Sequence, residues 1–207
     1  MSVAITIPAR LNSKRIKHKM LLDFDGEPLI RHVFDRVVTM GYDTFVLTDS
    51  KKIAKHIPSD NVIFTKKANN GTERIASVVD QFDGKYNKII NVQGDLIDVT
   101  RDLVIKIIEQ LDIEEVVTAY TTNPTSVKII HNGYRANWFT RKDLGYGDYH
   151  IGIYGYNLDA LYYYRDSKQS IEEKIEDLEQ LRFLKEFDIG VVHYDYDGRE
   201  INTKDDL

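Results

Sequence analysis

Residues 3–19 read VAITIPARLNSKRIKHK, and the expected fold is built outward from this stretch. Val3–Ile7 is an apolar run typical of a buried strand. The loop after it carries arginine and lysine side chains and no acidic residue, although the whole chain has a formal net charge of −5. Guanidinium and ammonium groups form charge-assisted hydrogen bonds with phosphate oxygens. A buried strand leading into a cationic loop therefore favours a polyphosphate site, although a solvated basic turn fits the charge equally well.

Composition predicts one globular unit. The 207 residues are 42% hydrophobic, which is enough for a full core, so we expect a single domain over residues 1–207. The sequence contains no cysteine, which excludes disulfides, thiolate metal sites and a cysteine nucleophile. Val3–Ile7 is too short for a signal peptide, and no run approaches the roughly twenty apolar residues that span a bilayer. We therefore expect a cytoplasmic chain without membrane contacts.

The charge balance also bears on nucleic acids. The chain is mildly acidic overall, and its basic loop lacks the interleaved aromatic side chains on which single-stranded bases stack. We expect no nucleic-acid partner.

Short β-rich runs alternate with helix-like segments through the first 120 residues. Pro28 suits the first turn of a helix, Thr48–Ser50 can cap another, and Thr100 a third. Strand and helix alternating at this pace predict an α/β fold with a mostly parallel sheet and helices on both faces. The expected strands are 3–7, 45–47, 62–64, 88–92 and 116–120, and the expected helices are 29–40, 51–56, 71–82 and 100–111.

The second half changes in style. Three expected strands at 127–130, 136–139 and 151–156 are joined by short turns, which predicts an antiparallel addition to the sheet. The longest helix is expected at 170–187, where Ser170 and Glu173 form a capping box, and a last strand follows at 189–194. The buried stripe of that helix would consist of Ile171, Ile175, Leu178, Leu181 and Leu184.

Chemistry-bearing residues fall just past strands or at helix starts. Arg10, Asp49, Gly71 and Asp95 all do so, and ligands of parallel sheets bind at the carboxyl ends of strands. The two commonest phosphate loops, GxGxxG and GxxxxGK[ST], are absent from the sequence. Asp95 at a strand end suits a magnesium ion shared with phosphates, although a turn carboxylate that accepts backbone N–H groups is the commoner case.

Other segments allow two interpretations. Gly71–Arg74 reads as a helix start with Thr72 as a cap and Glu73 at the positive terminus. His150–Tyr156 reads as a strand whose glycines allow close packing, or let a sugar approach. Glu179 and Gln180 read as an exposed polar pair on an amphipathic helix.

Taken in order, ten segments resemble the cytidylyltransferases that activate 3-deoxy-manno-octulosonate (Kdo). The resemblance spans nearly the whole chain, and three of its segments are specific in combination: NGTERI from Asn70, NVQGD from Asn91 and HIGIYGY from His150. The others are IPARLNSKRIKHK, DFDGEPLIRHVFDR, TD at 48–49, NPTSVKII, WFTR, LEQLRFL and INTKDDL. The resemblance implies a three-layer α/β/α sandwich of the nucleotide-diphospho-sugar transferase type around a mixed sheet. It also implies transfer of CMP from CTP to Kdo or a related acidic sugar, with release of pyrophosphate.

The resemblance assigns roles residue by residue. Arg15, Lys19 and Asp95 would be catalytic, and Asp95 and Asn202 would bind Mg2+. The nucleotide would be bound by Pro8, Ala9, Arg10, Ser13, Arg15, Lys19, Gly71, Thr72, Arg74 and Gln93. The acidic sugar would be bound by Arg141, His150, Tyr154, Glu179 and Gln180.

Departures from the family pattern leave an alternative open. Asn202 stands where a second metal-binding aspartate is expected, and Leu96-Ile97 replaces an acid and a proline after Asp95. The chain is also shorter before Asn123 and between Leu144 and Tyr149. The resemblance implies that the second gap removes a stretch that in relatives helps to cover the sugar and build a dimer. We expect an active enzyme and a possible homodimer. The alternative is a catalytically weakened protein of the same fold that binds a nucleotide or nucleotide sugar.

Overall fold

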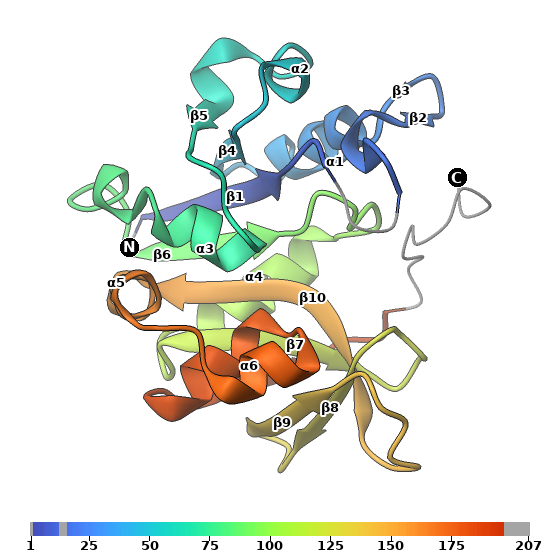
Figure 1. Ribbon diagram of the computed structural model, residues 1–207, viewed down its shortest axis with the longest axis vertical. Helices are drawn as coiled ribbons and strands as arrows, with labels where there is room; N and C mark the ends of the chain where they lie inside the picture. Colours follow the sequence, from blue (N-terminus) through green and yellow to red (C-terminus); the bar gives the residue numbers. More distant parts are fainter. Residues whose placement is uncertain (1, 13–15, 197–207) are drawn as a thin grey trace.

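The computed structural model describes residues 2–12 and 16–196. Within these residues nine strands form one sheet in the order β5-β4-β1-β6-β10-β7-β11-β9-β8, and β2 and β3 form a small hairpin (Figure 1). The strands are β1 (Val3–Ala9), β2 (Asp23–Phe24), β3 (Glu27–Pro28), β4 (Asp43–Thr48), β5 (Val62–Phe64), β6 (Lys88–Val92), β7 (Val116–Thr121), β8 (Lys128–His131), β9 (Arg135–Thr140), β10 (Asp148–Asn157) and β11 (Ile189–His193).

Helices and short 3-10 segments connect the strands. The α-helices are α1 (Leu29–Val38), α2 (Lys51–Ala54), α3 (Gly71–Ala76), α4 (Arg101–Gln110), α5 (Leu158–Asp166) and α6 (Ile171–Glu176). The 3-10 segments are η1 (Lys19–Leu21), η2 (Ser59–Asn61), η3 (Val79–Gln81) and η4 (Glu179–Lys185). No helix of the described residues is long and apolar enough to cross a membrane.

Alternation along the strands builds two hydrophobic cores, one on each face of the sheet. In β6, for example, Ile90 and Val92 face one core, whereas Ile89 faces the other. Helices α1, α2 and α4 supply side chains to the first core, and α3, α5 and η4 to the second. The expected three layers are therefore present.

The sheet is mixed, and only part of it is parallel. Neighbours run parallel from β5 through β6 and again between β7 and β11, but β10 runs antiparallel to both β6 and β7. The pairs β8–β9 and β9–β11 are also antiparallel. The predicted antiparallel addition is confirmed, and the predicted parallel sheet is found in β5, β4, β1 and β6. Short turns such as the one at Gly133 (φ 93°) can join only antiparallel neighbours.

The predicted long helix at 170–187 is broken into two pieces. The capping box of Ser170 and Glu173 is confirmed, but α6 ends at Asp177, which adopts a left-handed conformation (φ 53°). Ile171 and Ile175 are 68% and 73% exposed, so the predicted apolar stripe is wrong at its start. Leu178 and Leu181 are buried as predicted, although in η4.

A buried ion pair explains the break. Arg182 donates from Nε and Nη2 to both oxygens of Glu173, at 2.7 and 2.8 Å. In a continuous helix these residues, nine positions apart, would be about two and a half turns apart and on opposite faces. The reversal at Asp177 lets them meet.

Candidate active site

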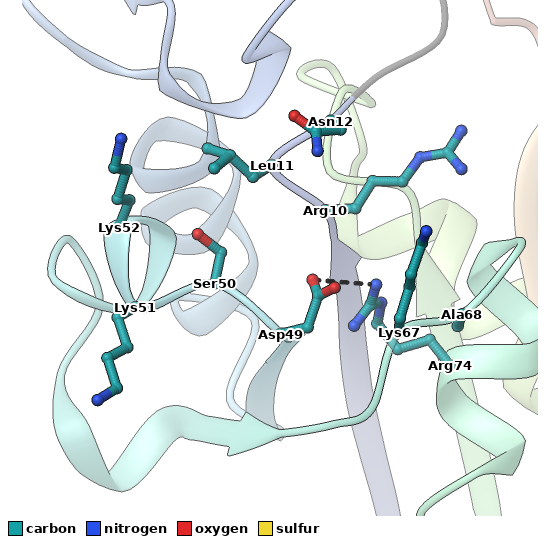
Figure 2. A pocket seen from close by; sticks show the side chains of 10 residues that line it. All are labelled: Arg10, Leu11, Asn12, Asp49, Ser50, Lys51, Lys52, Lys67, Ala68 and Arg74. Carbon is teal, nitrogen blue, oxygen red and sulfur yellow. Dashed lines mark ion pairs between the residues drawn. The ribbon is translucent and has the colours of Figure 1, made fainter.

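A cavity of about 370 Å³ opens where β1 and β4 end (Figure 2). Its walls come from the loop after β1, the turn between β4 and α2, and the segment between β5 and α3. The lining residues are Arg10, Leu11, Asn12, Asp49, Ser50, Lys51, Lys52, Lys67, Ala68 and Arg74. Basic side chains outnumber the one acidic side chain in this lining, so the cavity suits an anionic ligand.

Arg74 anchors positive charge at the cavity wall. Its side chain is 3% exposed, and Nη2 lies 3.3 Å from Asp49 Oδ1. Its Nη1 donates to the Thr65 hydroxyl and to the Lys66 carbonyl. Burial lowers the pKa of the Arg74 guanidinium, and nearby Arg10 lowers it further, while Asp49 opposes the shift. Figure 2 shows Asp49 and Arg74 facing each other, so the carboxylate holds the buried cation in place.

Pro8, Gly71 and Gln93 meet in a second part of the site. A Cβ atom on Gly71 would lie 3.1 Å from Pro8 Cγ and 3.5 Å from Gln93 Nε2. A Cβ atom on Gly152 would lie 3.5 Å from Gln93 Cγ, which places β10 beside the same amide. Residues predicted from separate segments to bind the nucleotide are therefore brought together, and Gly71 leaves little room for a side chain.

Lys19 and Asp95 form an ion pair across a long separation in sequence. Lys19 lies in η1 with a side chain only 9% exposed, whereas the Asp95 side chain is 37% exposed. The neighbouring residues Gly94 and Met20 are also packed together, since a Cβ atom on Gly94 would lie 2.7 Å from Met20 Sδ. The predicted approach of the amino-terminal basic segment to Asp95 is thus observed for Lys19.

The described acidic residues fit a metal that is shared with a substrate. Within residues 2–12 and 16–196, no group of three or more His, Asp and Glu side chains could hold a metal ion alone. Magnesium prefers one or two carboxylates together with phosphate oxygens, and the partly exposed Asp95 at the end of β6 suits such an arrangement. Ser13, Arg15 and Asn202, which the sequence also assigns to the site, lie outside the described residues.

The start of α3 differs from the prediction. Asn70, not Thr72, caps the helix, since its Oδ1 accepts from the Glu73 N–H at 2.7 Å. Thr72 instead donates to Glu179 Oε1 at 2.9 Å, and the Gly71 N–H donates to Glu179 Oε2 at 3.0 Å. Glu179, assigned to the sugar by resemblance, thus directs both carboxylate oxygens at the start of α3. Burial raises the pKa of Glu179, and these hydrogen bonds partly oppose the shift.

His150 and Tyr154 lie together on β10, with the rings 5.2 Å apart. His150 is 5% exposed, and its Nε2 lies 2.9 Å from the Thr118 hydroxyl. Burial, with a contribution from Arg141, lowers the pKa of His150 to about 3. Burial also raises the pKa of Tyr154, and Glu179 adds to this shift. Both side chains are therefore neutral near pH 7.

Gln180 is a further predicted sugar residue that the structure buries. It is 2% exposed, and its Nε2 has no hydrogen-bond partner among the described residues. A buried amide N–H without a partner is costly, so this donor suits a ligand oxygen.

The low pKa of His150 predicts how the stability of the fold depends on pH. The unfolded chain binds this proton near pH 6.5 and the folded chain near 3, so the unfolded state holds more protons between these values. Stability from this histidine is complete above pH 6.5 and is lost as the pH falls toward 3. We expect His150→Gln to flatten the fall in unfolding free energy over that range, measured by denaturant titration at several pH values. His56→Gln, at an exposed position, is the control, and identical slopes for the parent and His150→Gln would contradict the prediction.

The structure adds residues that the sequence interpretation missed. Lys51, Lys52 and Lys67 line the cavity, and Tyr156 contacts Thr72. The Lys66-Lys67 pair after a strand was the available signal, since it is a second basic cluster at a carboxyl end. Nothing in the sequence distinguishes Tyr156 from an ordinary core tyrosine.

Comparisons with known proteins agree with this geometry. The fold and the basic cavity at its strand ends define the class of nucleotide-diphospho-sugar transferases. A solved structure of CMP:2-keto-3-deoxy-manno-octonic acid synthetase complexed with CTP is 27% identical and superposes with a TM-score of 0.85, covering 98% of this chain and 94% of that one. An inositol-1-phosphate CTP transferase from T. maritima, 14% identical with a TM-score of 0.71 over 100% and 91% of the two chains, shares the fold.

Sequence relatives define the family more narrowly. The cytidylyltransferase family model matches residues 4–189. A 3-deoxy-manno-octulosonate cytidylyltransferase from Bartonella henselae is 34% identical over 87% of this chain and 85% of its own length. The corresponding protein from Francisella tularensis is 33% identical over 88% and 86%. The chain belongs to the 3-deoxy-manno-octulosonate cytidylyltransferase family.

Proposed function

We propose that this chain transfers CMP from CTP to the anomeric hydroxyl of Kdo or a closely related acidic sugar, with release of pyrophosphate. The observation that carries the proposal is the meeting of Lys19 with Asp95 at the strand ends that also form the basic cavity, in a chain of this family.

The nucleotide is assigned to the amino-terminal half of the sheet edge. Arg10 and Lys67 line the cavity and can neutralise phosphate oxygens, and Arg74 supplies a buried cation beside them. Pro8 and Gly71 leave a narrow surface that suits a flat ring or a ribose. Ala9, at the end of β1, places its backbone next to this surface.

The sugar is assigned to the region of β10 and η4. Arg141 lies close enough to His150 and Tyr154 to influence both pKa values, and its exposed guanidinium suits a sugar carboxylate. Gln180 offers a buried N–H donor to a sugar oxygen. His150 is too weak a base at neutral pH to accept the hydroxyl proton, so its proposed role is to bind and orient the sugar.

The reaction needs no covalent enzyme intermediate. The anomeric oxygen forms a bond to the α-phosphorus while the bond from that phosphorus to the pyrophosphate oxygen breaks, and the hydroxyl proton passes to solvent. Magnesium, when bound, supplies positive charge at the phosphates and lowers the pKa of a coordinated hydroxyl, and Asp95, with Asn202 as a proposed second ligand, would hold it. The ion pair with Lys19 holds the Asp95 carboxylate in place. The chain's own contribution is orientation and charge neutralisation.

The test is a pyrophosphate-release assay with each nucleoside triphosphate paired with Kdo and related acidic sugars. We expect release with CTP and an acidic sugar, and little release with UTP, ATP or GTP. A cooperative melting transition first establishes that the purified protein is folded. A folded protein that binds CTP but releases no pyrophosphate with any of these sugars would favour the alternative of a catalytically weakened binding protein.

A further inference from the structure

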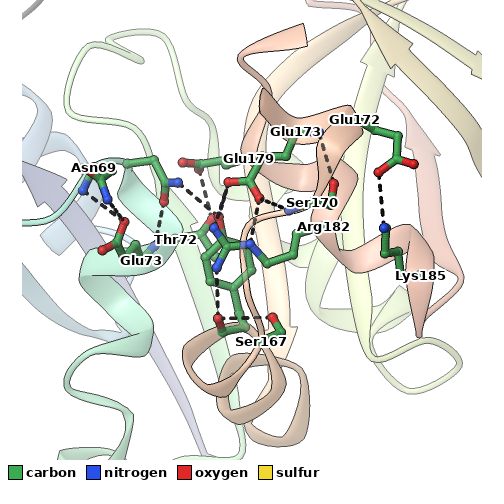
Figure 3. A network of polar contacts seen from close by, with 12 residues as sticks. Asn69, Thr72, Glu73, Ser167, Ser170, Glu172, Glu173, Glu179, Arg182 and Lys185 are labelled. Atoms are coloured by element: carbon green, nitrogen blue, oxygen red, sulfur yellow. Dashed lines mark hydrogen bonds and ion pairs between the residues drawn. The ribbon is translucent and has the colours of Figure 1, made fainter. Parts of the chain in front are cut away.

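Two hydrogen-bonded chains connect the segment 69–73, here called the nucleotide loop, to the segment α6–η4 (Figure 3). The loop precedes and opens α3, whereas α6–η4 carries Glu179 and Gln180 of the proposed sugar site. More than ninety positions separate the ends of each link in the sequence, so these contacts are purely tertiary.

The first chain joins Thr72 directly to Glu179 and continues from Thr72 to Tyr156 of β10. Asn91 Nδ2 donates to the Tyr156 hydroxyl at 3.4 Å, and this hydroxyl lies 2.9 Å from Thr72 Oγ1. Thr72 donates its only hydroxyl hydrogen to Glu179 Oε1, so towards Tyr156 its oxygen can only accept. Tyr156 must therefore donate to Thr72, and the direction of every bond in the chain is determined.

The second chain runs through Tyr164. Asn70 uses Oδ1 to cap α3, and its Nδ2 donates to the Tyr164 hydroxyl at 3.0 Å. That hydroxyl donates to Glu173 Oε1 at 3.3 Å, and Glu173 is held in turn by Arg182. The Arg182 guanidinium also lies 3.8 Å from the centre of the Tyr164 ring.

The two tyrosines belong to one packed column of rings. Phe183 of η4 lies 5.5 Å from Tyr156 and 5.0 Å from Tyr164, between ring centroids. On its other side, Tyr156 stacks on Tyr154 at 6.0 Å, and Tyr154 contacts His150. The column therefore joins residues of the proposed sugar site to both hydroxyls that hold the nucleotide loop.

We propose that Tyr156 and Tyr164 are positioning residues: Tyr156 holds the nucleotide loop against β10, and Tyr164 holds it against α6, so that Gly71 and Thr72 stay in their CTP-binding positions. The proposal rests on the function proposed above. Both hydroxyls bond to protein groups, so the two tyrosines act through these partners: Thr72 and Asn91 for Tyr156, and Asn70 and Glu173 for Tyr164. A buried polar chain of this kind determines one geometry, because each alternative leaves a donor or acceptor unpaired.

The test removes one hydroxyl at a time. We expect Tyr156→Phe and Tyr164→Phe each to weaken CTP binding about tenfold, measured by calorimetry with CTP alone, and to raise the KM for CTP by a similar factor. Tyr86→Phe is the matched control, since Tyr86 donates to Asp43 at 2.8 Å near the amino end of β4, away from the site. It should bind CTP within about twofold of the parent.

A ligand-free measurement accompanies the calorimetry. Hydrogen exchange of a peptide covering residues 69–76 should be faster in Tyr156→Phe and in Tyr164→Phe than in the parent, and unchanged in Tyr86→Phe. CTP affinity and exchange at parent values in the two variants would overturn the proposal. If one variant does not fold, the other carries the test. If the parent chain does not bind CTP, both the proposed function and this inference are wrong. If the parent binds CTP and the two variants bind it equally well, only the inference is wrong.

Discussion

Asp95→Asn is expected to lower the rate of CMP transfer at least about a hundredfold while the chain stays folded. Asparagine keeps the shape of the side chain and an oxygen that can accept from the buried Lys19, but it removes the negative charge proposed to hold the metal. The measurement is pyrophosphate release at saturating CTP and sugar, repeated over a range of Mg2+ concentrations. We expect part of the lost rate to return as Mg2+ is raised, because the defect lies in metal affinity.

The chain contains a matched control for this substitution. Lys88 and Asp112 form an ion pair with nearly the same burial, 4% and 53% exposed against 9% and 37% for Lys19 and Asp95. This second pair lies at the amino end of β6, away from the site. Asp112→Asn should change the melting temperature by a similar amount and leave the rate close to that of the parent. A large drop in melting temperature for Asp95→Asn alone, or a rate within tenfold of the parent, would argue that Asp95 is structural.

The largest expected effect on stability comes from Glu173→Gln. This change leaves the buried Arg182 charge without its carboxylate partner, and breaking such a pair costs about 3–5 kcal/mol. For a chain of this size the melting temperature should fall by about 10 °C. The loss includes the second hydrogen-bonded chain, because Tyr164 also donates to Glu173.

Glu172→Gln is the neighbouring control. Glu172 pairs with Lys185 at 3.3 Å, and these side chains are 40% and 50% exposed against 2% and 8% for Glu173 and Arg182, so water reaches this pair far more than the buried one. We expect little change in its melting temperature by calorimetry. The double change Glu173→Gln with Arg182→Leu should recover part of the loss, because it also removes the stranded charge. Equal melting temperatures for the two glutamate variants would contradict the assignment of the helix break to this pair.

Local patterns predicted much of the fold. Strand β6 matches its expected range of 88–92, and Thr100 and Ser170 cap their helices as predicted. These features depend on neighbours in the sequence: apolar side chains at a local period, and side-chain oxygens within reach of a backbone N–H three residues on. Arg10 and Asp95 were also placed correctly at strand ends, because the carboxyl ends of neighbouring parallel strands meet at one edge.

The errors fall where distant segments compete with local preference. A helical pattern over 170–187 is locally sound, yet the Glu173–Arg182 pair requires a reversal at Asp177. Thr72 is a good helix cap in isolation, but in the structure its hydroxyl donates a hydrogen bond to Glu179 instead. In both cases a hydrogen bond to a carboxylate that local helix geometry would not bring into contact outweighs the local conformational preference.

The sequence by itself determined the class of fold, the family and the residues proposed to bind the substrates, because hydrophobic period, caps and motif order can be read along the chain. Only the tertiary structure decided which hydroxyls hold the nucleotide loop, why the last long helix breaks, and that Glu179 faces Gly71 and Thr72. These depend on buried donors and acceptors finding partners far along the chain, and the cost of leaving such groups unpaired selects one arrangement.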